Sequence, residues 1–326
     1  MRRCNRQMLV SIIIPCYRSE KTIGPVVEEI DRVFREKDGF DYELILVNDG
    51  SPDDTYSVIR QICEENSRVT GIDLSRNFGQ SNARMAGVKY IHGDVLIMMD
   101  DDGQHPAEGI FRLIEKLGEG YDLVYAYFPK KKHSVFKRFS SWLNGLIMTL
   151  LGQKENEIKI SSFAAYGTFA VKAIKNNNCP VPATGSYIRR VSRRIGNVEM
   201  EHRGRLAGKS NYTLRRMFLK WERGLTGFST KSLSVVLRLG ALVTTGSFLF
   251  ALITFIRKIT QPNLKLGYAS IMIVILLCSG IIMMMLGVLG GYIGQVYMVL
   301  MRMPSFLIRE EVLSRYGGKE EKDIEL

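Results

Sequence analysis

Short apolar runs and segments with helical spacing alternate along the first 130 residues of the chain. The runs, each bounded by polar or turn-forming residues, predict β-strands. They are Leu9–Pro15, Tyr42–Asn48, Val69–Ser75, Val95–Met99 and Asp122–Tyr127. The segments between them place apolar residues on one helical face, and they are Ile23–Lys37, Thr55–Glu65, Ser81–Ile91 and about Pro106–Leu117. Strands that alternate with helices predict an α/β fold with a mostly parallel, doubly wound sheet.

Residues 235–302 have a different pattern, because they are strongly apolar throughout. Leu239–Ile256 and Leu266–Met301 contain no charged residue, and stretches of this length can cross a bilayer as helices. We therefore predict a two-helix transmembrane hairpin, with helices at about 235–256 and 269–298. The flank Lys209–Arg238 has seven basic residues and the connecting segment Arg257–Lys265 has three. The positive-inside rule then places both ends of the hairpin in the cytoplasm.

These patterns predict five parts of the chain. They are an N-terminal tail (1–8), a cytoplasmic α/β domain (9–200), a basic juxtamembrane segment (201–233), the membrane hairpin (234–302) and a cytoplasmic C-terminal tail (303–326). Within the second part, Ser134–Leu151 has amphipathic spacing after a run of lysines. This segment predicts either a helix at the membrane interface or a helix packed on the sheet.

Composition adds constraints on partners and compartment. The formal net charge is +12, and much of the excess lies just before the apolar region. This placement favours an anionic membrane surface over nucleic acid. The five cysteines are scattered and form no CxxC pair, which argues against a disulfide framework or a zinc site and fits a reducing compartment. Glycines in the apolar region permit close contacts between helices, so the sequence is compatible with a homo-oligomer.

The candidate chemistry begins where the fourth strand ends. Asp100, Asp101 and Asp102 follow Val95–Met99 directly, at the edge of the sheet where open α/β sheets bind ligands. Three adjacent carboxylates repel one another, so a positive partner is expected. Hard oxygen ligands suit Mg²⁺ or Mn²⁺, which commonly share their coordination with substrate phosphates. The alternative is a solvated acidic loop that caps the following helix.

Polar residues also follow the other strands, and four loops therefore converge on one edge of the sheet. They contribute Tyr17 and Glu20, Asp49 and Ser51, Arg76 and Gln80, and Asp100 to Gln104. In an extended turn, Asp100, Asp102 and Gln104 lie on one side. The first loop lacks GxGxxG, which argues against an NAD-binding domain.

A second candidate site lies in the basic segment. Residues 205–212 read RLAGKSNY; its glycine permits close backbone approach, and its Arg, Lys and Ser supply donors to an anion. The alternative is a solvated basic face that meets lipid head groups, and both interpretations can hold together.

Taken in order, the motifs SIIIPCYRSE, LVNDGSPDDT, LSRNFGQSNARMAG, MDDDGQHP and RLAGKSNY precede the predicted hairpin. This set resembles the family 2 glycosyltransferases that charge polyprenyl phosphate, such as dolichol-phosphate mannose synthases and the bacterial undecaprenyl-phosphate glucosyl and aminoarabinosyl transferases. The resemblance covers nearly the whole chain. It implies a GT-A nucleotide-diphospho-sugar transferase domain, a divalent metal, inversion at the sugar, and a multi-pass protein of the inner membrane whose catalytic domain is cytoplasmic.

The resemblance also implies roles for single residues. Asp100 and Asp102 would be catalytic, Asp102 with Gln104 would hold the metal, and Arg205, Lys209 and Ser210 would bind the acceptor phosphate. The nucleotide sugar would contact Pro15, Tyr17, Glu20, Asp49, Ser51 and Asp100.

Two departures from the family pattern stand out. Relatives carry an Asp and then an Arg in the stretch that corresponds to Ile158–Lys172, but this chain has Ala164 at the Arg position and no Asp. Glu155 or Glu157 could substitute for the carboxylate. The usual DDGS is here Asn48 followed by Asp49, Gly50 and Ser51. The first departure bears on the acceptor or sugar pocket.

Several alternatives therefore remain. A catalytically degenerate membrane scaffold is favoured by the lost Asp and Arg and opposed by the retained acidic motif. Transfer to another lipid acceptor is a second alternative. A processive polysaccharide synthase would carry QxxRW, whereas Trp221 lies in LKWERG. A metal phosphodiesterase would need more His or Asp ligands.

Overall fold

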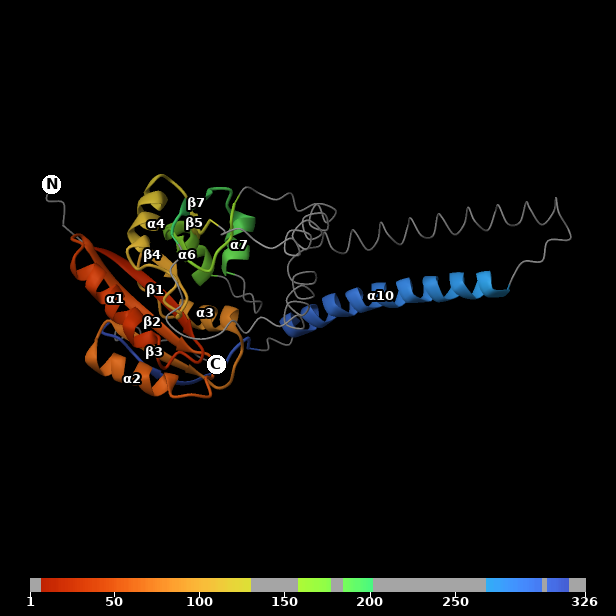
Figure 1. Cartoon of the computed structure of the whole chain (residues 1–326), viewed down its shortest axis with the longest axis horizontal. Helices are drawn as coiled ribbons and strands as arrows, with labels where there is room; N and C mark the ends of the chain where they lie inside the picture. Colours follow the sequence, from red (N-terminus) through yellow and green to blue (C-terminus); the bar gives the residue numbers. More distant parts are fainter. Residues whose placement is uncertain (1–6, 130–157, 177–183, 202–267, 301–303, 317–326) are drawn as a thin grey trace. The chain divides into compact units, whose positions relative to one another are not determined.

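The computed structural model describes residues 7–129, 158–176, 184–201, 268–300 and 304–316 (Figure 1). Its first part contains the predicted alternation. The strands are β1 (Met8–Cys16), β2 (Phe40–Asn48), β3 (Val69–Leu74), β4 (Val95–Met98) and β5 (Leu123–Tyr127). The helices are α1 (Ile23–Arg35), α2 (Thr55–Glu65), α3 (Gln80–Val88) and α4 (Gly109–Gly118). All nine elements predicted from the sequence pattern in this part are confirmed, with ends that shift by a few residues.

Six further described elements complete the structure, and only α10 coincides with an element predicted above. They are β6 (Ala164–Tyr166), α6 (Thr168–Lys175), α7 (Thr184–Val191), β7 (Ile195–Glu199), α10 (Tyr268–Leu300) and β8 (Ile308–Val312). The sheet that they complete has eight strands in the order β7-β5-β6-β4-β1-β2-β3-β8.

The sheet is mixed rather than wholly parallel. Strands β1, β2, β3 and β4 pair in parallel, as do β5 and β7. Strand β6 lies between β4 and β5 and runs antiparallel to both, and β8 runs antiparallel to β3. The prediction of a mostly parallel sheet therefore holds, with two strands reversed.

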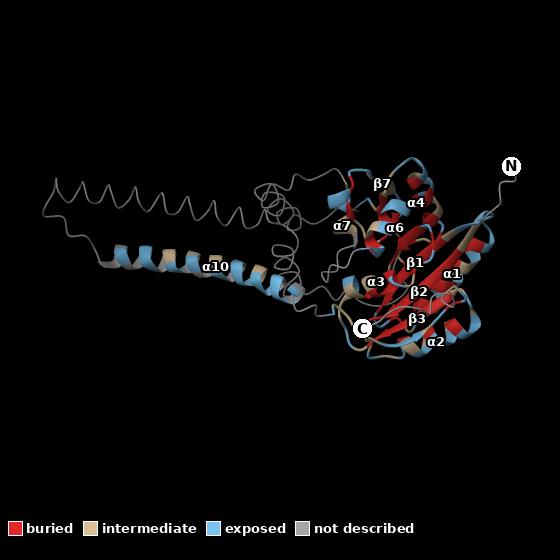
Figure 2. Ribbon diagram, turned by 180° about the vertical axis from the view of Figure 1, so that it is seen from behind, coloured by how far each residue is buried: buried red, intermediate tan, exposed pale blue. Residues whose placement is uncertain are grey.

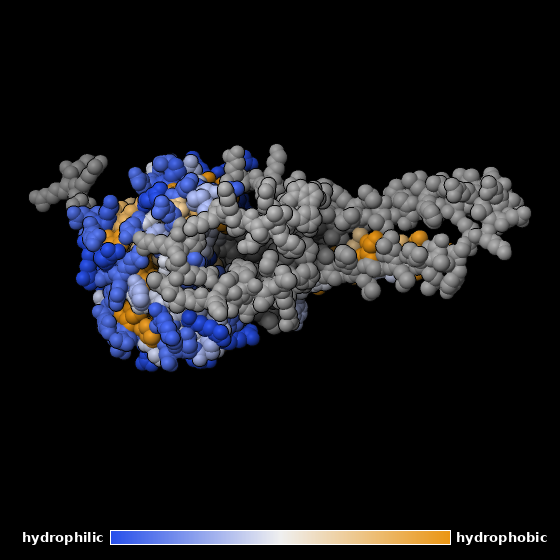
Figure 3. Space-filling model, in the orientation of Figure 1, coloured by the Kyte–Doolittle hydropathy of each residue, from blue (hydrophilic) through white to orange (hydrophobic). Residues whose placement is uncertain are grey.

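Helices cover both faces of this sheet, as a doubly wound fold requires. Along β1, Ile12 and Ile14 belong to the core shared with α1, α2 and α4, whereas Ile13 belongs to the core shared with α3, α6 and α7. Alternation of this kind follows from the two-residue repeat of a strand. Figure 2 shows the buried strands between partly exposed helices, and the exposed surface of this part is mostly hydrophilic in the view of Figure 3.

The helix α1 illustrates why these segments fold as predicted. Its buried residues recur every three or four positions, and they are Ile23, Val26, Val27, Ile30, Val33 and Phe34. This is the apolar face predicted from the sequence. Burial of each such side chain contributes about 1.5–3 kcal/mol, which fixes α1 against the sheet.

The strand β8 joins the edge of the sheet from the far end of the chain. Its residues pair with β3 over Gly71–Leu74, and the segment that follows it continues along the domain. The N–H of Ser314 donates to Thr70 Oγ1 at 3.1 Å, and the N–H of Arg315 donates to the Ser67 carbonyl. The predicted tail at 303–326 therefore includes a strand of the sheet.

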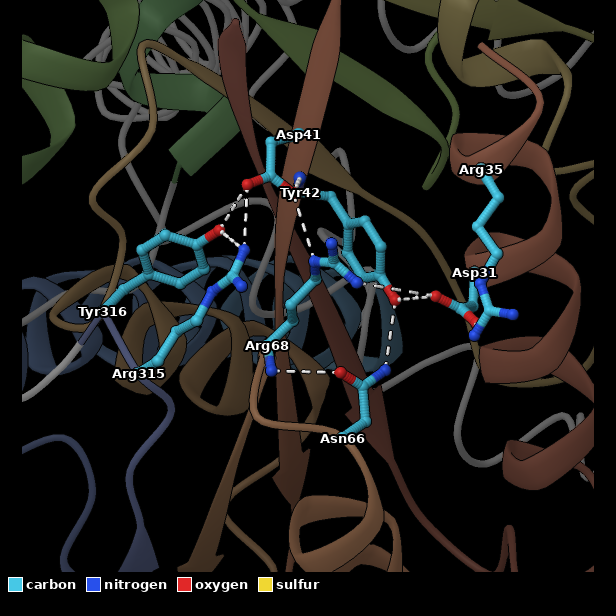
Figure 4. Close-up of polar contacts among 8 residues, drawn as sticks. All are labelled: Asp31, Arg35, Asp41, Tyr42, Asn66, Arg68, Arg315 and Tyr316. Atoms are coloured by element: carbon cyan, nitrogen blue, oxygen red, sulfur yellow. Dashed lines mark hydrogen bonds and ion pairs between the residues drawn. The ribbon is translucent and has the colours of Figure 1, made fainter. Parts of the chain in front are cut away.

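Polar side chains secure this segment at the amino-terminal end of β2 (Figure 4). The carboxylate of Asp41 accepts from Tyr316 Oη at 2.7 Å, from an Arg315 Nη2 at 2.9 Å and from Arg68 Nε at 3.1 Å. Asp31, Tyr42 and Asn66 extend the network. We call these contacts of Asp41 with Arg68, Arg315 and Tyr316 the Asp41 cluster.

The chain divides into two compact units. One comprises 1–132, 157–209 and 303–326, and the other comprises 133–156 and 210–302. Helix α10 coincides with the second predicted membrane helix, whereas the first, at 235–256, and the amphipathic segment Ser134–Leu151 lie outside the described residues. Among the helices that the structure describes, none is long and apolar enough to cross a membrane. Cys16, Cys63 and Cys278 are free cysteines.

Candidate functional site

The loops after β1, β2, β3 and β4 are joined by hydrogen bonds at the carboxyl edge of the sheet. The loop after β1 contacts the acidic motif, because the Tyr17 N–H donates to Asp101 Oδ2 at 3.2 Å and the Ser19 hydroxyl donates to the same oxygen. Burial raises the pKa of Asp101, and these two donors oppose that rise. Asp101 is therefore the residue that ties the β1 loop to the β4 loop.

The loop after β1 also meets the loop after β2. The N–H of Arg18 donates to Ser51 Oγ at 3.1 Å, and the N–H of Asp54 donates to Glu20 Oε2 at 3.4 Å. Pro15 is buried within β1 opposite Val47, whereas the side chain of Tyr17 is 41% exposed. The structure thus brings the predicted nucleotide-binding residues of these two loops to one edge.

Asp49 is turned toward the loop after β3. Its Oδ1 accepts the Phe78 N–H at 2.7 Å, and its Oδ2 accepts the Gly79 N–H at 2.9 Å. The residue is 3% exposed. Burial raises the pKa of Asp49, although the two backbone donors lower it. Asp49 therefore holds the β3 loop in place, a contact that the sequence did not indicate.

Asp100 accepts hydrogen bonds on both carboxylate oxygens. Gln80 Nε2 and an Arg84 Nη2 donate to Oδ1 at 2.5 and 2.8 Å, and Ser162 Oγ donates to Oδ2 at 2.5 Å. Sequence reasoning included Gln80 but missed Arg84 and Ser162. The available signal was the spacing of Gln80 and Arg84, which are four positions apart and share a face of α3.

His105 is buried beside the acidic motif, contacts it through a hydrogen bond and stacks on aromatic side chains. Its ring stacks on Phe163 at 4.9 Å and on Phe128 at 5.8 Å between ring centroids. Nδ1 accepts the Asp100 N–H at 3.0 Å, so the proton of the neutral ring is assigned to Nε2. His105 therefore caps the loop that carries the acidic motif.

Asp102 and Gln104 are the predicted metal ligands. Both are partly buried, and the Gln104 N–H donates to Asp102 Oδ1 at 3.2 Å, which closes a turn around Gly103 at φ +72°. Their carboxylate and amide oxygens are hard donors that fit Mg²⁺ or Mn²⁺. Within the described residues, no three His, Cys, Asp or Glu side chains are grouped to hold a metal ion. Two protein ligands would leave the remaining positions to phosphate and water.

The departure at 158–172 can be placed in the fold. Ala164 is 1% exposed in β6, where it pairs with Met98 of β4 and Tyr125 of β5. Position 164 therefore lies in the interior of the sheet, two residues after the Ser162 that binds Asp100. The other predicted residues, Arg205, Lys209 and Ser210 and the alternatives Glu155 and Glu157, lie outside the described residues.

The site is thus an acidic carboxyl edge with hard oxygen ligands on a mixed α/β sheet. Its carboxylates accept hydrogen bonds from the loops after β1, β2 and β3, from α3 and from Ser162. The model of the family described as "Glycosyl transferase family 2" matches residues 11–175. The chain therefore belongs to glycosyl transferase family 2, and it is a glycosyltransferase with a GT-A α/β fold.

Relatives match more than nine-tenths of the chain. The uncharacterized glycosyltransferase YkcC of Bacillus subtilis is 32% identical over 94% of this chain and 95% of its own length. The bactoprenol glucosyl transferase of Shigella phage SfX is 30% identical over 93% and 99%. The undecaprenyl-phosphate 4-deoxy-4-formamido-L-arabinose transferase of Edwardsiella ictaluri is 29% identical over 96% and 97%.

Among solved structures, glucosyl-3-phosphoglycerate synthase from Mycobacterium tuberculosis, in complex with Mn²⁺ and UDP-glucose, is similar. Its TM-score is 0.49 at 19% identity, over 69% of this chain and 79% of that chain.

Proposed function

We propose that this protein transfers a sugar from a nucleotide-diphosphate sugar to a polyprenyl phosphate at the cytoplasmic face of a cell membrane. The observation that carries the proposal is the match, over 93% and 96% of the chain, to relatives that are named for this transfer, a bactoprenol glucosyl transferase and an undecaprenyl-phosphate 4-deoxy-4-formamido-L-arabinose transferase. A match over 93% and 96% of the chain extends well beyond the family 2 domain at 11–175, which supports a shared acceptor as well as a shared donor class.

The donor site lies at the carboxyl edge of the sheet. We assign nucleotide contacts to Pro15 near the carboxyl end of β1, to Tyr17, Glu20 and Ser51 in the loops after β1 and β2, and to Asp100. Exposure of the Tyr17 ring supports this assignment. Asp49 acts indirectly, because its carboxylate accepts hydrogen bonds from the backbone of the loop after β3 and so holds that loop in place.

A divalent cation, Mg²⁺ or Mn²⁺, fits the donor oxygens of Asp102 and Gln104. When bound there, it would offset the negative charge that develops on the leaving diphosphate. The protein's own contribution is to orient these two side chains. The turn around Gly103 and the hydrogen bonds to Asp100 and Asp101 serve that purpose.

The proposed reaction is a direct displacement with inversion. An oxygen of the lipid phosphate forms a bond to the anomeric carbon, while the bond from that carbon to the nucleotide diphosphate breaks and the electron pair leaves with the diphosphate. The nucleophile is already anionic at pH 7, so it needs positioning more than deprotonation. The absence of the expected Asp from 158–172 is therefore compatible with catalysis. We assign Arg205, Lys209 and Ser210 to the acceptor phosphate.

The acceptor cannot leave the bilayer, which supports a membrane-attached enzyme. The uncharged sequences at 239–256 and 266–301 would supply the two-helix hairpin of a multi-pass protein. Along α10, apolar side chains that include Ile282, Leu286 and Ile293 are more than half exposed. A hydrocarbon environment would cover such a surface.

The test is nucleotide release by purified protein from a panel of UDP- and GDP-sugars. The assay is run with Mg²⁺ or Mn²⁺, with and without undecaprenyl phosphate. Asp102→Ala is compared with Asp94→Ala, an exposed carboxylate at the other end of β4. We expect release that needs both lipid and metal, that is lost in Asp102→Ala and that persists in Asp94→Ala.

Other outcomes discriminate the alternatives. Release with a different lipid phosphate, and not with undecaprenyl phosphate, would replace the acceptor. No turnover with any donor by a folded protein that binds nucleotide would favour the membrane scaffold, which the alanine at position 164 already suggests as the second candidate.

A further inference from the structure

Arg84 is a largely buried cation that has no assigned role in the proposed reaction. Its side chain is 16% exposed, and its Nη2 lies 2.8 Å from Asp100 Oδ1. It follows Gln80 by four positions, so one face of α3 presents an amide and a guanidinium to the same carboxylate oxygen. Asp100 thereby gains two donors from one rigid helix.

This placement is costly. Arg84 Nε is buried and has no hydrogen-bond partner within the described part of the chain. A buried donor left unsatisfied destabilises the folded protein, and a buried guanidinium without a paired anion destabilises it more. The ion pair with Asp100 offsets the cost of burying Arg84 only while the two side chains stay in contact. This favours a specific role for Arg84 over that of a solvated surface charge.

The acidic motif needs such a partner. Asp100, Asp101 and Asp102 are consecutive, and their mutual repulsion favours a positive charge nearby. Arg84 supplies one, and the Ser162 hydroxyl holds the other oxygen of Asp100. Because both oxygens of Asp100 accept hydrogen bonds, its carboxylate is held in one orientation, two residues before Asp102.

The guanidinium lies on the face of the sheet to which position 164 belongs. Ala83 and Ala86 of α3 share one core with Ala164 and Tyr125. Burial raises the pKa of Tyr125, and the nearby charge of Arg84 opposes that rise. Position 164, where the family resemblance implies an arginine, is Ala164, whereas Arg84 reaches the acidic edge from α3.

We propose that Arg84 is a positioning residue of the donor site, which acts by fixing the Asp100 carboxylate for its contact with the nucleotide. This inference rests on the proposed function. Loss of Arg84 frees Asp100 from one charged donor, and a charge-assisted hydrogen bond is about twice as strong as a neutral one. The effect belongs to donor binding and leaves acceptor binding unchanged.

The experiment compares Arg84→Ala and Arg84→Lys with Arg112→Ala, an exposed arginine on α4. Donor and acceptor KM values are measured with each protein. Binding of UDP and GDP with Mn²⁺ is measured by calorimetry without acceptor, and Tm is recorded. We expect Arg84→Ala to raise the donor KM and the Kd of the bound nucleotide about ten-fold, or about 1.4 kcal/mol. The acceptor KM should stay within about two-fold, because contacts to the acceptor are unchanged.

Arg84→Lys keeps the charge but loses the planar fork, so we expect it to recover part of the donor affinity. The proposal is overturned if donor KM and nucleotide Kd in Arg84→Ala match those of Arg112→Ala, even when kcat or Tm falls, since such a fall alone marks a structural role. Wild-type protein that neither turns over nor binds a nucleotide diphosphate overturns the proposed function and this inference with it.

Discussion

At the scale of single residues, Gly50 marks the closest approach of two loops of the site. It has φ +57°, and a Cβ placed on it would lie 2.3 Å from the carbonyl carbon of Arg76. The loop after β2 and the loop after β3 therefore meet backbone to backbone. This approach lets Asp49, the preceding residue, reach the N–H groups of Phe78 and Gly79.

We predict that Gly50→Ala destabilises the protein much more than Gly39→Ala. Both glycines have positive φ, but a Cβ at Gly39 meets nothing within 4 Å. The control should lose about 1–2 kcal/mol from backbone strain alone, whereas Gly50→Ala should lose about 1–3 kcal/mol more through overpacking. Denaturant unfolding of both variants measures the difference. Equal losses would show that the two loops can separate without cost.

Single residues also show how far sequence reasoning reaches. Convergence of Asp49 and Asp100 was predictable, because the ends of parallel strands share an edge. The direction of Asp49 was not, since it depends on the path of a loop that is distant in sequence. Arg84 was missed because a charge on a helix usually faces solvent. The aromatic stack around His105 joins residues from three separate segments, and no local pattern indicates it.

At the scale of elements, the sequence pattern failed to predict both reversed strands, β6 and β8, as well as the parallel strand β7. Strand β6 has only three residues, Ala164–Tyr166, so it is too short to show alternation. Strand β8 reads IREEV, and its charged residues hide the strand pattern. Charge is typical of edge strands, where it discourages pairing with other chains. Both strands exist because of partners distant in sequence, which local propensity does not contain.

The attachment of β8 predicts a pH-dependent effect of Tyr316→Phe. Burial opposes ionisation of Asp41, but hydrogen bonds from Tyr316 and Tyr42 and the charges of Arg68 and Arg315 outweigh it and lower the pKa of Asp41. A lowered pKa in the folded state contributes stability above the unfolded pKa of about 3.9. That stability is lost as the pH falls through the folded value. Tyr316→Phe should therefore cost about 1 kcal/mol at pH 7, and less in acid.

Thermal unfolding at about pH 7 and at about pH 3, on either side of the ordinary Asp value, measures this effect. The matched control is Tyr121→Phe, which removes a hydroxyl outside the Asp41 cluster and should show no such pH dependence. An equal loss of stability in Tyr316→Phe at both pH values would contradict this prediction. It would mean that the hydrogen bond from the Tyr316 hydroxyl does not stabilise the ionised form of Asp41.

At the scale of the whole molecule, β8 makes the sheet a product of both ends of the chain. The sequence pattern predicted a cytoplasmic C-terminal tail at 303–326, and it indicated no strand there. We predict that a chain ending at Leu307 is less stable than one ending at Gly317. Loss of the β3 pairing and the Asp41 contacts should cost roughly 3 kcal/mol or more, a fall in Tm of roughly 6–12 °C.

Calorimetry and light scattering of the two truncated proteins in the same detergent make this comparison. The shorter chain should also aggregate, because β3 then presents unpaired backbone groups at its edge. Equal Tm values and equal scattering for the two chains would mean that the domain is complete without β8.

The position of β8 also has a consequence for how the protein is made. Arg309 binds the carbonyl of Ser75 across 234 positions. At about 5–20 residues per second, the ribosome adds β8 roughly 10–50 s after β3. During that interval the edge of the sheet at β3 is unpaired in the nascent domain, while the ribosome is still synthesising the apolar region. A chaperone that shields exposed strands would therefore be needed most during translation of 76–307, and ribosome stalling there should lead to aggregation or degradation of the chain.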